Sequence, residues 1–242
     1  IKENVPMKII SEEHGEINVT PNPKYLVVLD GIDGSSGLVA NPKSRCGTMI
    51  SIANNLNPTY NDFVFGGLTE FIKKRICYAT IGKGCYLIEN SGENESTRKI
   101  KGIKRNNLNP ETKIHLDSKR FYPDYKEGIT SKLDEISEFV DMNFTRKLDG
   151  KFILSGLNSS SSMCLDLILG EVDIICGVIA KGVFEPPAEY RLLKEIGGVL
   201  LNTNGNKINE EKWREYGRPL SALIRVASPE IGKELIKILK TH

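Results

Sequence analysis

The sequence contains no long hydrophobic run and very little histidine. No stretch is apolar enough over a sufficient length to span a bilayer, and no signal peptide is evident. The three histidines, His14, His115 and His242, form no pattern, so neither histidine-based catalysis nor a zinc site is expected. These absences argue against a membrane protein and against a histidine-centred active site.

The chain also lacks a charge excess of either sign, with 33 Lys and Arg against 31 Asp and Glu. Because the basic residues are scattered, we expect no nucleic-acid partner and no membrane partner. The cysteines are odd in number and lack the spacing of a metal site, and most of them lie in apolar runs. This pattern indicates buried thiols in a reducing compartment, and we expect a cytoplasmic protein.

One segment combines an apolar run with two carboxylates and small residues. Tyr25 to Leu29 is short, rich in β-formers and preceded by prolines, which predicts a buried strand. Asp30 and Asp33 follow it and offer the hard oxygen ligands that magnesium prefers. Gly34, with Ser35 and Ser36, suits exposed amides that bind a phosphoryl group. The segment therefore predicts a metal and a phosphate side by side, although Asp, Gly and Ser are also ordinary turn residues.

Two further acidic segments could complete such a site, and each has a simpler explanation. Glu12 and Glu13 end another apolar run, and a hairpin could fold them back onto the aspartates, but a Glu-Glu pair is commonly a solvated turn. Glu185 precedes Pro186 at a predicted helix start, where negative charge is favoured, so it could be a helix cap or a metal ligand.

A run of serines from Ser159 to Ser162 precedes the apolar stretch Met163 to Leu169 and Gly170-Glu171-Val172-Asp173. By itself, this run predicts a serine-rich helix start.

Together these segments resemble the inositol monophosphatase and fructose-1,6-bisphosphatase superfamily of magnesium-dependent, lithium-sensitive sugar phosphatases. The family's Gly-Glu-Glu segment is similar to 11–13, and its Asp-Pro-Ile-Asp-Gly-Thr signature to 30–35. Its Trp-Asp-x-Ala-Ala helix start, which ends in Glu-Ala-Gly-Gly, resembles 184–188 through 195–198. The order of the four segments agrees over nearly the whole chain.

The resemblance implies a ligand set for two or three Mg²⁺ ions. Glu12, Asp30 and the backbone carbonyl of Ile32 would bind one ion, and Asp30, Asp33 and Glu185 would contribute to a second. It also implies roles around these ions. Gly34, Ser35 and Ser36 would hold the phosphate, Ser159 and Ser160 would line the substrate pocket, and Ser35 and Glu12 would be catalytic.

Several residues depart from the family pattern. Gly31 replaces the usual proline, Glu185 stands where aspartate is usual, and Phe184 replaces tryptophan. The acid that would act with Ser35 on the attacking water normally lies upstream of the Glu-Glu segment. We expect the N-terminal helices that carry it to precede Ile1, since the chain starts without methionine.

The predicted function is a magnesium-dependent phosphomonoesterase that hydrolyses a small sugar, polyol or inositol phosphate by a metal-activated water. Two alternatives stay open: a diverged homologue that binds metal or phosphate without catalysis, and a nucleotide 3′-phosphatase of the same family. The expected partner is a small phosphate ester, and the resemblance implies a homodimer.

The rest of the chain predicts a layered α/β fold. The resemblance implies an α+β layered sandwich of αβαβα type, with an N-terminal sub-domain over 1–148 and a C-terminal one over 149–242. We expect strands over 49–53, 63–66, 76–80, 84–88, 199–201 and 222–226, a loop or hairpin over 91–105, and helices around 133–140, over 186–196 and from 229.

Overall fold

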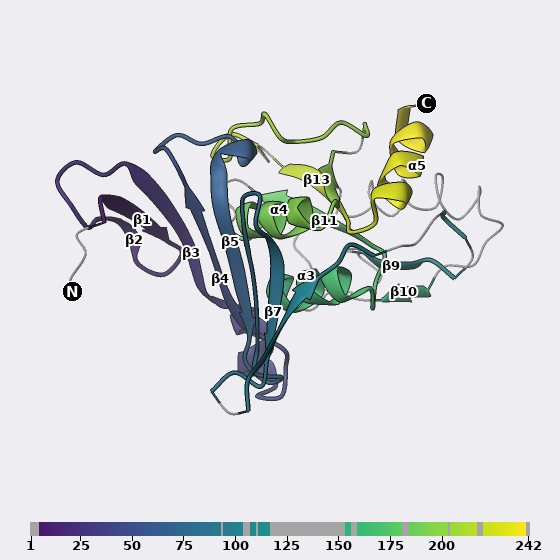
Figure 1. The fold of residues 1–242 in the computed structure, drawn as a ribbon, viewed down its shortest axis with the longest axis horizontal. Helices are drawn as coiled ribbons and strands as arrows, with labels where there is room; N and C mark the ends of the chain where they lie inside the picture. The colour runs from purple at the N-terminus through teal and green to yellow at the C-terminus, as the bar shows by residue number, and fades with distance from the viewer. Residues whose placement is uncertain are drawn as a thin grey trace.

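The computed structural model describes residues 5–92, 94–103, 107–109, 111–116, 153–155, 159–180, 184–202, 204–216 and 220–240. Within these ranges the chain forms two sheets and their helices, and Figure 1 shows α3 and α4 between the sheets. The predicted helix around 133–140 and the predicted boundary at 148/149 lie outside the described residues.

The first sheet has eight strands in the order β2-β1-β3-β4-β5-β6-β7-β8. Strand β1 runs parallel to β3, and the other neighbours are antiparallel. The strands are β1 (Met7–Ser11), β2 (Gly15–Asn18), β3 (Tyr25–Asp33), β4 (Gly47–Ala53), β5 (Phe63–Glu70), β6 (Arg75–Thr80), β7 (Gly84–Glu89) and β8 (Ser96–Ile100).

The second sheet has five strands in the order β10-β9-β11-β13-β12. Strand β9 is parallel to both of its neighbours, whereas β13 is antiparallel to both of its own. The strands are β9 (Lys113–Leu116), β10 (Ile153–Ser155), β11 (Ile174–Ala180), β12 (Val199–Leu201) and β13 (Leu220–Val226). Strand β9 belongs to the predicted N-terminal sub-domain by its position in the sequence, but it lies in the second sheet. The division into two sub-domains stays a prediction.

The helices fill the space between the sheets and cover the second one. Helices α3 and α4 contact β4 and β5 on one side and β11 and β12 on the other, while α5 packs on β13. The order sheet, helices, sheet, helix agrees with four layers of the predicted αβαβα sandwich. The helices are α1 (Ser35–Ala40), the 3₁₀ helix η1 (Tyr60–Asp62), α3 (Ser160–Leu169), α4 (Pro186–Glu195) and α5 (Pro229–Lys240).

The local sequence explains where these elements begin and which faces they bury. Strand β4 alternates buried and partly buried residues along its length, as a strand with one face on the core should. Helix α3 begins after its N-cap Ser159, and α5 begins with Pro229, as the sequence predicts. Most of α3 is buried because it lies between two sheets, so its hydrophobic residues are not confined to one face.

The strand predictions are largely confirmed, although some observed strands are longer than predicted. Strand β5 continues to Glu70 rather than ending at Gly66, and the predicted loop or hairpin over 91–105 contains β8, which pairs antiparallel with β7. Four of the five residues of β8 are exposed, because it is an edge strand, so its sequence lacks the apolar alternation of a half-buried strand.

All five cysteines are buried and free, as predicted. Among the described residues, no helix is long and apolar enough to cross a membrane.

Candidate metal and phosphate site

Both aspartates of the glycine-rich segment lie on strand β3, which continues to Asp33 instead of ending at Leu29. Side chains along a regular strand alternate between faces, so residues three apart would point to opposite sides. Here Asp30 pairs with Met49 and Asp33 with Gly47, which marks a bulge between the two aspartates. Both aspartates are buried at 2% and 5% exposure, and the bulge explains how they share a face.

The Glu-Glu pair reaches Asp30 because β1 and β3 run in parallel. Ser11 pairs with Leu29 in this register, and the amide of Glu12 donates to the Leu29 carbonyl at 3.1 Å. The two strands therefore deliver their next carboxylates to the same edge of the sheet. Glu13 lies even closer to the turn, because its carboxylate accepts a hydrogen bond from the amide of Ile32 at 3.3 Å.

Gly31 leaves room for the Glu13 carboxylate. A Cβ atom at position 31 would lie 3.1 Å from Glu13 Oε2, which is tighter than most Cβ contacts in proteins, so the glutamate would have to shift. The proline of the family pattern is thus replaced by a residue that lets a second glutamate approach the backbone.

Glu185 arrives from the second half of the chain, at the N-cap position of α4. Its side chain makes no capping hydrogen bond, and the helix amides of Ala188 and Glu189 bond instead to its backbone carbonyl. The carboxylate of Glu185 therefore does not cap α4 through a hydrogen bond.

Two groups of carboxylates result, and both contain Asp30. We call Glu12, Glu13 and Asp30 the outer group, and Asp30, Asp33 and Glu185 the inner group. Within each group, one ligand oxygen from every residue lies within 4.8 Å of the others. The outer group has two exposed members, whereas the inner group consists of two buried aspartates and a half-buried glutamate.

Like charges in a buried space change the protonation of these acids. Burial, followed by the charges of Asp33 and Glu12, raises the pKa of Asp30 to about 7. Burial is also the main cause that raises the pKa of Glu185 to about 8. Burial and the charge of Glu13 raise the pKa of Glu12. Hydrogen bonds to the Glu13 carboxylate lower the pKa of Glu13 itself. The surroundings of the inner group therefore disfavour the ionised form of its acids when no cation is bound.

The serine run holds Asp33 rather than standing free. The amides of Ser160 and Ser161 donate to Asp33 at 3.1 and 2.7 Å, and the Ser161 hydroxyl donates at 2.6 Å. Ser159 caps the same helix, because its Oγ accepts a hydrogen bond from the amide of Ser162 at 3.3 Å. The predicted helix start is confirmed, and the role of Ser159 and Ser160 as substrate contacts stays a prediction.

The predicted phosphate-binding residues lie directly after Asp33, at the start of α1. Gly34 is the N-cap of α1 and has φ +85°, a conformation that favours glycine. A Cβ atom on Gly34 would lie 2.5 Å from the Cβ of Ser159, so glycine is also required by the close approach of α3. Ser35 is exposed and Ser36 follows it in the same helix.

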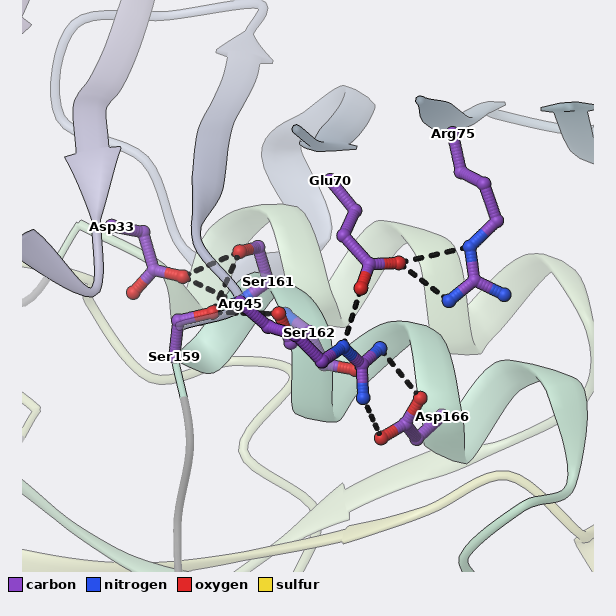
Figure 2. A network of polar contacts seen from close by, with 8 residues as sticks. All are labelled: Asp33, Arg45, Glu70, Arg75, Ser159, Ser161, Ser162 and Asp166. Carbon is purple, nitrogen blue, oxygen red and sulfur yellow. Dashed lines mark hydrogen bonds and ion pairs between the residues drawn. The ribbon is translucent and has the colours of Figure 1, made fainter. Parts of the chain in front are cut away.

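Sequence reasoning missed other residues that shape the site. Glu13 was visible as half of the Glu-Glu pair but received no ligand role, although its carboxylate belongs to the outer group. The Thr48 hydroxyl donates to the Gly31 carbonyl at 2.8 Å and thereby holds the bulge. Arg45 and Asp166, which Figure 2 shows beside the serine run, belong to no motif that could have identified them.

Comparisons with known proteins support the fold. No protein-family model matches the chain, and no curated protein sequence matches it either. Solved structures do match. Inositol monophosphatase II from Staphylococcus aureus is 13% identical, with a TM-score of 0.68, over 98% of this chain and 75% of its own. A putative sedoheptulose-1,7-bisphosphatase from Toxoplasma gondii is 16% identical, with a TM-score of 0.69, over 100% of this chain and 78% of its own.

A third match is a hypothetical protein from Pyrococcus horikoshii that is described as similar to inositol-1 monophosphatase. It is 19% identical, with a TM-score of 0.63, over 96% of this chain and 76% of its own. At these identities the matches establish the fold alone, which this chain shares with the inositol monophosphatase and the putative bisphosphatase.

Proposed function

We propose that the protein is a magnesium-dependent phosphomonoesterase that acts on a small sugar, polyol or inositol phosphate. The observation that carries this proposal is the sharing of Asp30 between the outer and inner groups. The outer and inner groups share one buried aspartate and therefore suit two neighbouring divalent cations. Such a pair of cations serves phosphoryl transfer.

The donor chemistry of the site supports magnesium. Every ligand in the two groups is a carboxylate oxygen, the donor that hard cations prefer. The raised pKa values of Asp30 and Glu185 have burial as their main cause and like charges as a further one. A bound cation would remove this electrostatic cost, so the residues present fit the metal.

In this proposal Glu12, Asp30 and the Ile32 carbonyl hold one ion, and Asp30, Asp33 and Glu185 hold a second. A third ion would use the remaining carboxylate of the outer group, Glu13. When bound, magnesium neutralises charge on the phosphoryl and leaving oxygens and lowers the pKa of a coordinated water.

The residues after Asp33 would bind and orient the phosphate. The first amides of α1, at Ser35 and Ser36, have no carbonyl partner four residues earlier in the helix and can donate to phosphoryl oxygens. Ser35 is exposed, and its hydroxyl would help to hold the attacking water. Glu12, at the edge of the site, would act with the metal it binds.

The solved structures of similar fold suggest which substrates to test. One structure of the Staphylococcus enzyme contains inositol monophosphate, and another contains 2′-AMP. Inositol phosphates, sugar mono- and bisphosphates and nucleotide monophosphates, including 3′-phosphates, therefore belong in the panel. The resemblance further supports a homodimer, which sedimentation of the purified protein would test. The five buried free thiols support a reducing, cytoplasmic location.

The direct test is phosphate release from this panel, with magnesium and with a chelator. We expect turnover of at least one phosphomonoester in magnesium and none in chelator. The variant Asp33→Asn should remove turnover, while Glu111→Gln, which changes an exposed acid outside both groups, should retain it. No turnover of any member of the panel by the unmodified protein would contradict the proposal.

Calorimetric titration with magnesium separates the catalytic proposal from its non-catalytic alternative. A diverged homologue would bind magnesium through the same carboxylates but release no phosphate. Magnesium binding without turnover would therefore favour that alternative, and absence of both would reject the metal site itself.

A further inference from the structure

The guanidinium of Arg45 connects helix α3 to the first sheet. Its Nη1 and Nη2 donate to the two oxygens of Asp166 on α3, at 2.6 and 2.8 Å. Its Nε donates to Glu70, the last residue of β5 (Figure 2). A planar guanidinium can make all of these bonds at once because its donors form a fixed fork.

The partners of Arg45 are themselves held in place. Glu70 is fully buried and also accepts a hydrogen bond from Arg75 Nε at 2.8 Å. Two arginines and two carboxylates thus balance in charge, and Asp166 is nearly buried at 6% exposure. Such a neutral, multiply bonded cluster fixes geometry more strongly than an exposed ion pair does.

The same helix holds the metal-facing aspartate at its other end. Among the hydrogen bonds of the described residues, Asp33 Oδ2 accepts two, from the amide and hydroxyl of Ser161, whereas Oδ1 accepts one, from the amide of Ser160. Each carboxylate oxygen has two lone pairs, so Oδ1 keeps one for a further partner. The first turn of α3 therefore decides which oxygen of Asp33 is offered to the inner group.

Asp166 lies little more than one helical turn beyond Ser161, so the two contacts share one rigid segment. Arg45 Nη2 also approaches the carbonyl of Ser162, in the first turn, at 3.4 Å. A shift of α3 along the sheet at Arg45 would therefore move the amides that bind Asp33.

We propose that Arg45 is a positioning residue for the inner group, which it serves by fixing α3 so that the amides of Ser160 and Ser161 orient Asp33. This inference rests on the proposed function, because it assigns a use to the inner group as a magnesium site. Arg45 touches neither the metal nor the substrate in this arrangement. It acts through Asp166 and the first turn of α3.

The test measures the Mg²⁺ affinity of Arg45→Gln and Asp166→Asn by calorimetry, at a temperature where circular dichroism shows each variant folded. Outer partners of metal ligands typically change affinity by about 10- to 100-fold, and we expect a loss of about tenfold for either variant. Because Asp166→Asn keeps the shape of the side chain, it serves even if Arg45→Gln fails to fold. Arg45→Lys should not restore the affinity, since an ammonium group cannot replace the fork.

Arg75→Gln is the matched control, because Arg75 also binds Glu70 but makes no hydrogen bond to the described residues of α3. It should lower the melting temperature while changing the Mg²⁺ affinity by less than about twofold. If Arg75→Gln weakens Mg²⁺ as much as Arg45→Gln does, the effect is a general loss of stability and the inference is wrong. Unchanged affinity in both Arg45→Gln and Asp166→Asn would also overturn it.

Turnover and affinity of the unmodified protein distinguish this inference from the proposed function. If the unmodified protein neither binds Mg²⁺ nor releases phosphate, both proposals fail together. If it does both, and the Arg45 and Asp166 variants bind Mg²⁺ normally, only the positioning role fails.

Discussion

The outer and inner groups contain the same kind of ligand but differ in where their residues come from and in how much water surrounds them. The outer group is formed by two neighbouring parallel strands, β1 and β3, and two of its three acids are exposed. The inner group combines β3 with α4, more than 150 residues later in the chain, and both of its aspartates are buried. Charge in the inner group is therefore harder to hold without a cation, because water screens it less.

Asp30 belongs to both groups, and its loss should have the largest effect. We expect Asp30→Asn to lower kcat/KM by at least about a thousandfold, on the order of 4 kcal/mol of transition-state stabilisation. Phosphate-release kinetics with saturating magnesium measure this change. Glu111→Gln is the control, and a loss below about tenfold for Asp30→Asn would show that the two groups do not work as one site.

Replacing one acid that belongs to only one of the two groups compares the groups directly. Glu185→Gln should weaken Mg²⁺ binding by about a hundredfold, whereas Glu12→Gln should weaken it by about tenfold, since Glu12 is exposed and Glu13 remains beside it. Calorimetric titration of the two variants under the same conditions gives the ratio. Equal losses, or a larger loss at Glu12, would remove the distinction between the groups.

Protons should compete with magnesium mainly at the inner group. With pKa values of about 7 for Asp30 and about 8 for Glu185, the free protein must release protons before it binds the cation. The Mg²⁺ affinity should therefore rise at least about tenfold from about pH 6 to about pH 8. In Glu185→Gln this dependence should become shallower, and an affinity that is independent of pH would contradict the proton competition.

The same pKa shifts predict how the metal-free protein responds to pH. Asp30 has a folded pKa above its ordinary value of 3.8, so the folded state binds more protons than the unfolded state between these values. The free energy of unfolding should therefore fall as pH rises from about 4 to about 7, and magnesium should restore it at higher pH.

Asp30→Asn removes this electrostatic cost and should raise the melting temperature in chelator at about pH 8, by roughly 2–4 °C for each kcal/mol relieved. Differential scanning calorimetry in chelator at two pH values checks both parts. A lower melting temperature for Asp30→Asn at high pH would show that the inner acids are not destabilising when ionised.

Two glycines beside the two groups give the smallest predicted difference. Gly34 and Gly15 both have positive φ, but a Cβ atom would clash with Ser159 only at Gly34 and meets nothing within 4 Å at Gly15. Gly15→Ala should cost about 1 kcal/mol from backbone strain alone, and Gly34→Ala about 1–3 kcal/mol more from the displaced helix α3. Denaturant unfolding of both variants measures this difference in the free energy of unfolding. Equal losses in the two variants would mean that α3 can shift away from the added methyl group at little cost.

Much of the fold could be predicted because its signals are local. Helix starts at Ser159, Pro186 and Pro229 depend on capping residues and on proline, which act within one turn. Most strands of the first sheet follow apolar runs between turn residues. Strand β8 could be predicted only as part of a loop or hairpin over 91–105, because an exposed edge strand has neither signal.

The candidate site divides in the same way. Its acidic residues could be identified because they follow predicted buried strands or precede a predicted helix. The order of these segments along the chain also matches a known metal-site pattern. The resemblance implied two sets of ligands that share Asp30, but the residues alone could not place Glu13 in the outer group, since its position depends on the parallel register of β1 with β3 and on the bulge in β3. Arg45 and Asp166 carry no motif, and only their contact across 121 residues gives them a role.

The sequence by itself determined most of the elements, the acidic residues of the candidate site and the resemblance to a sugar phosphatase, because propensity and motif order depend on neighbouring residues. Only the tertiary structure decided that Glu13 joins the outer group, that the side chain of Glu185 makes no capping hydrogen bond, and that the serine run holds Asp33. Those facts depend on burial and on contacts between distant segments, which arise only when two sheets and the helices between them pack together.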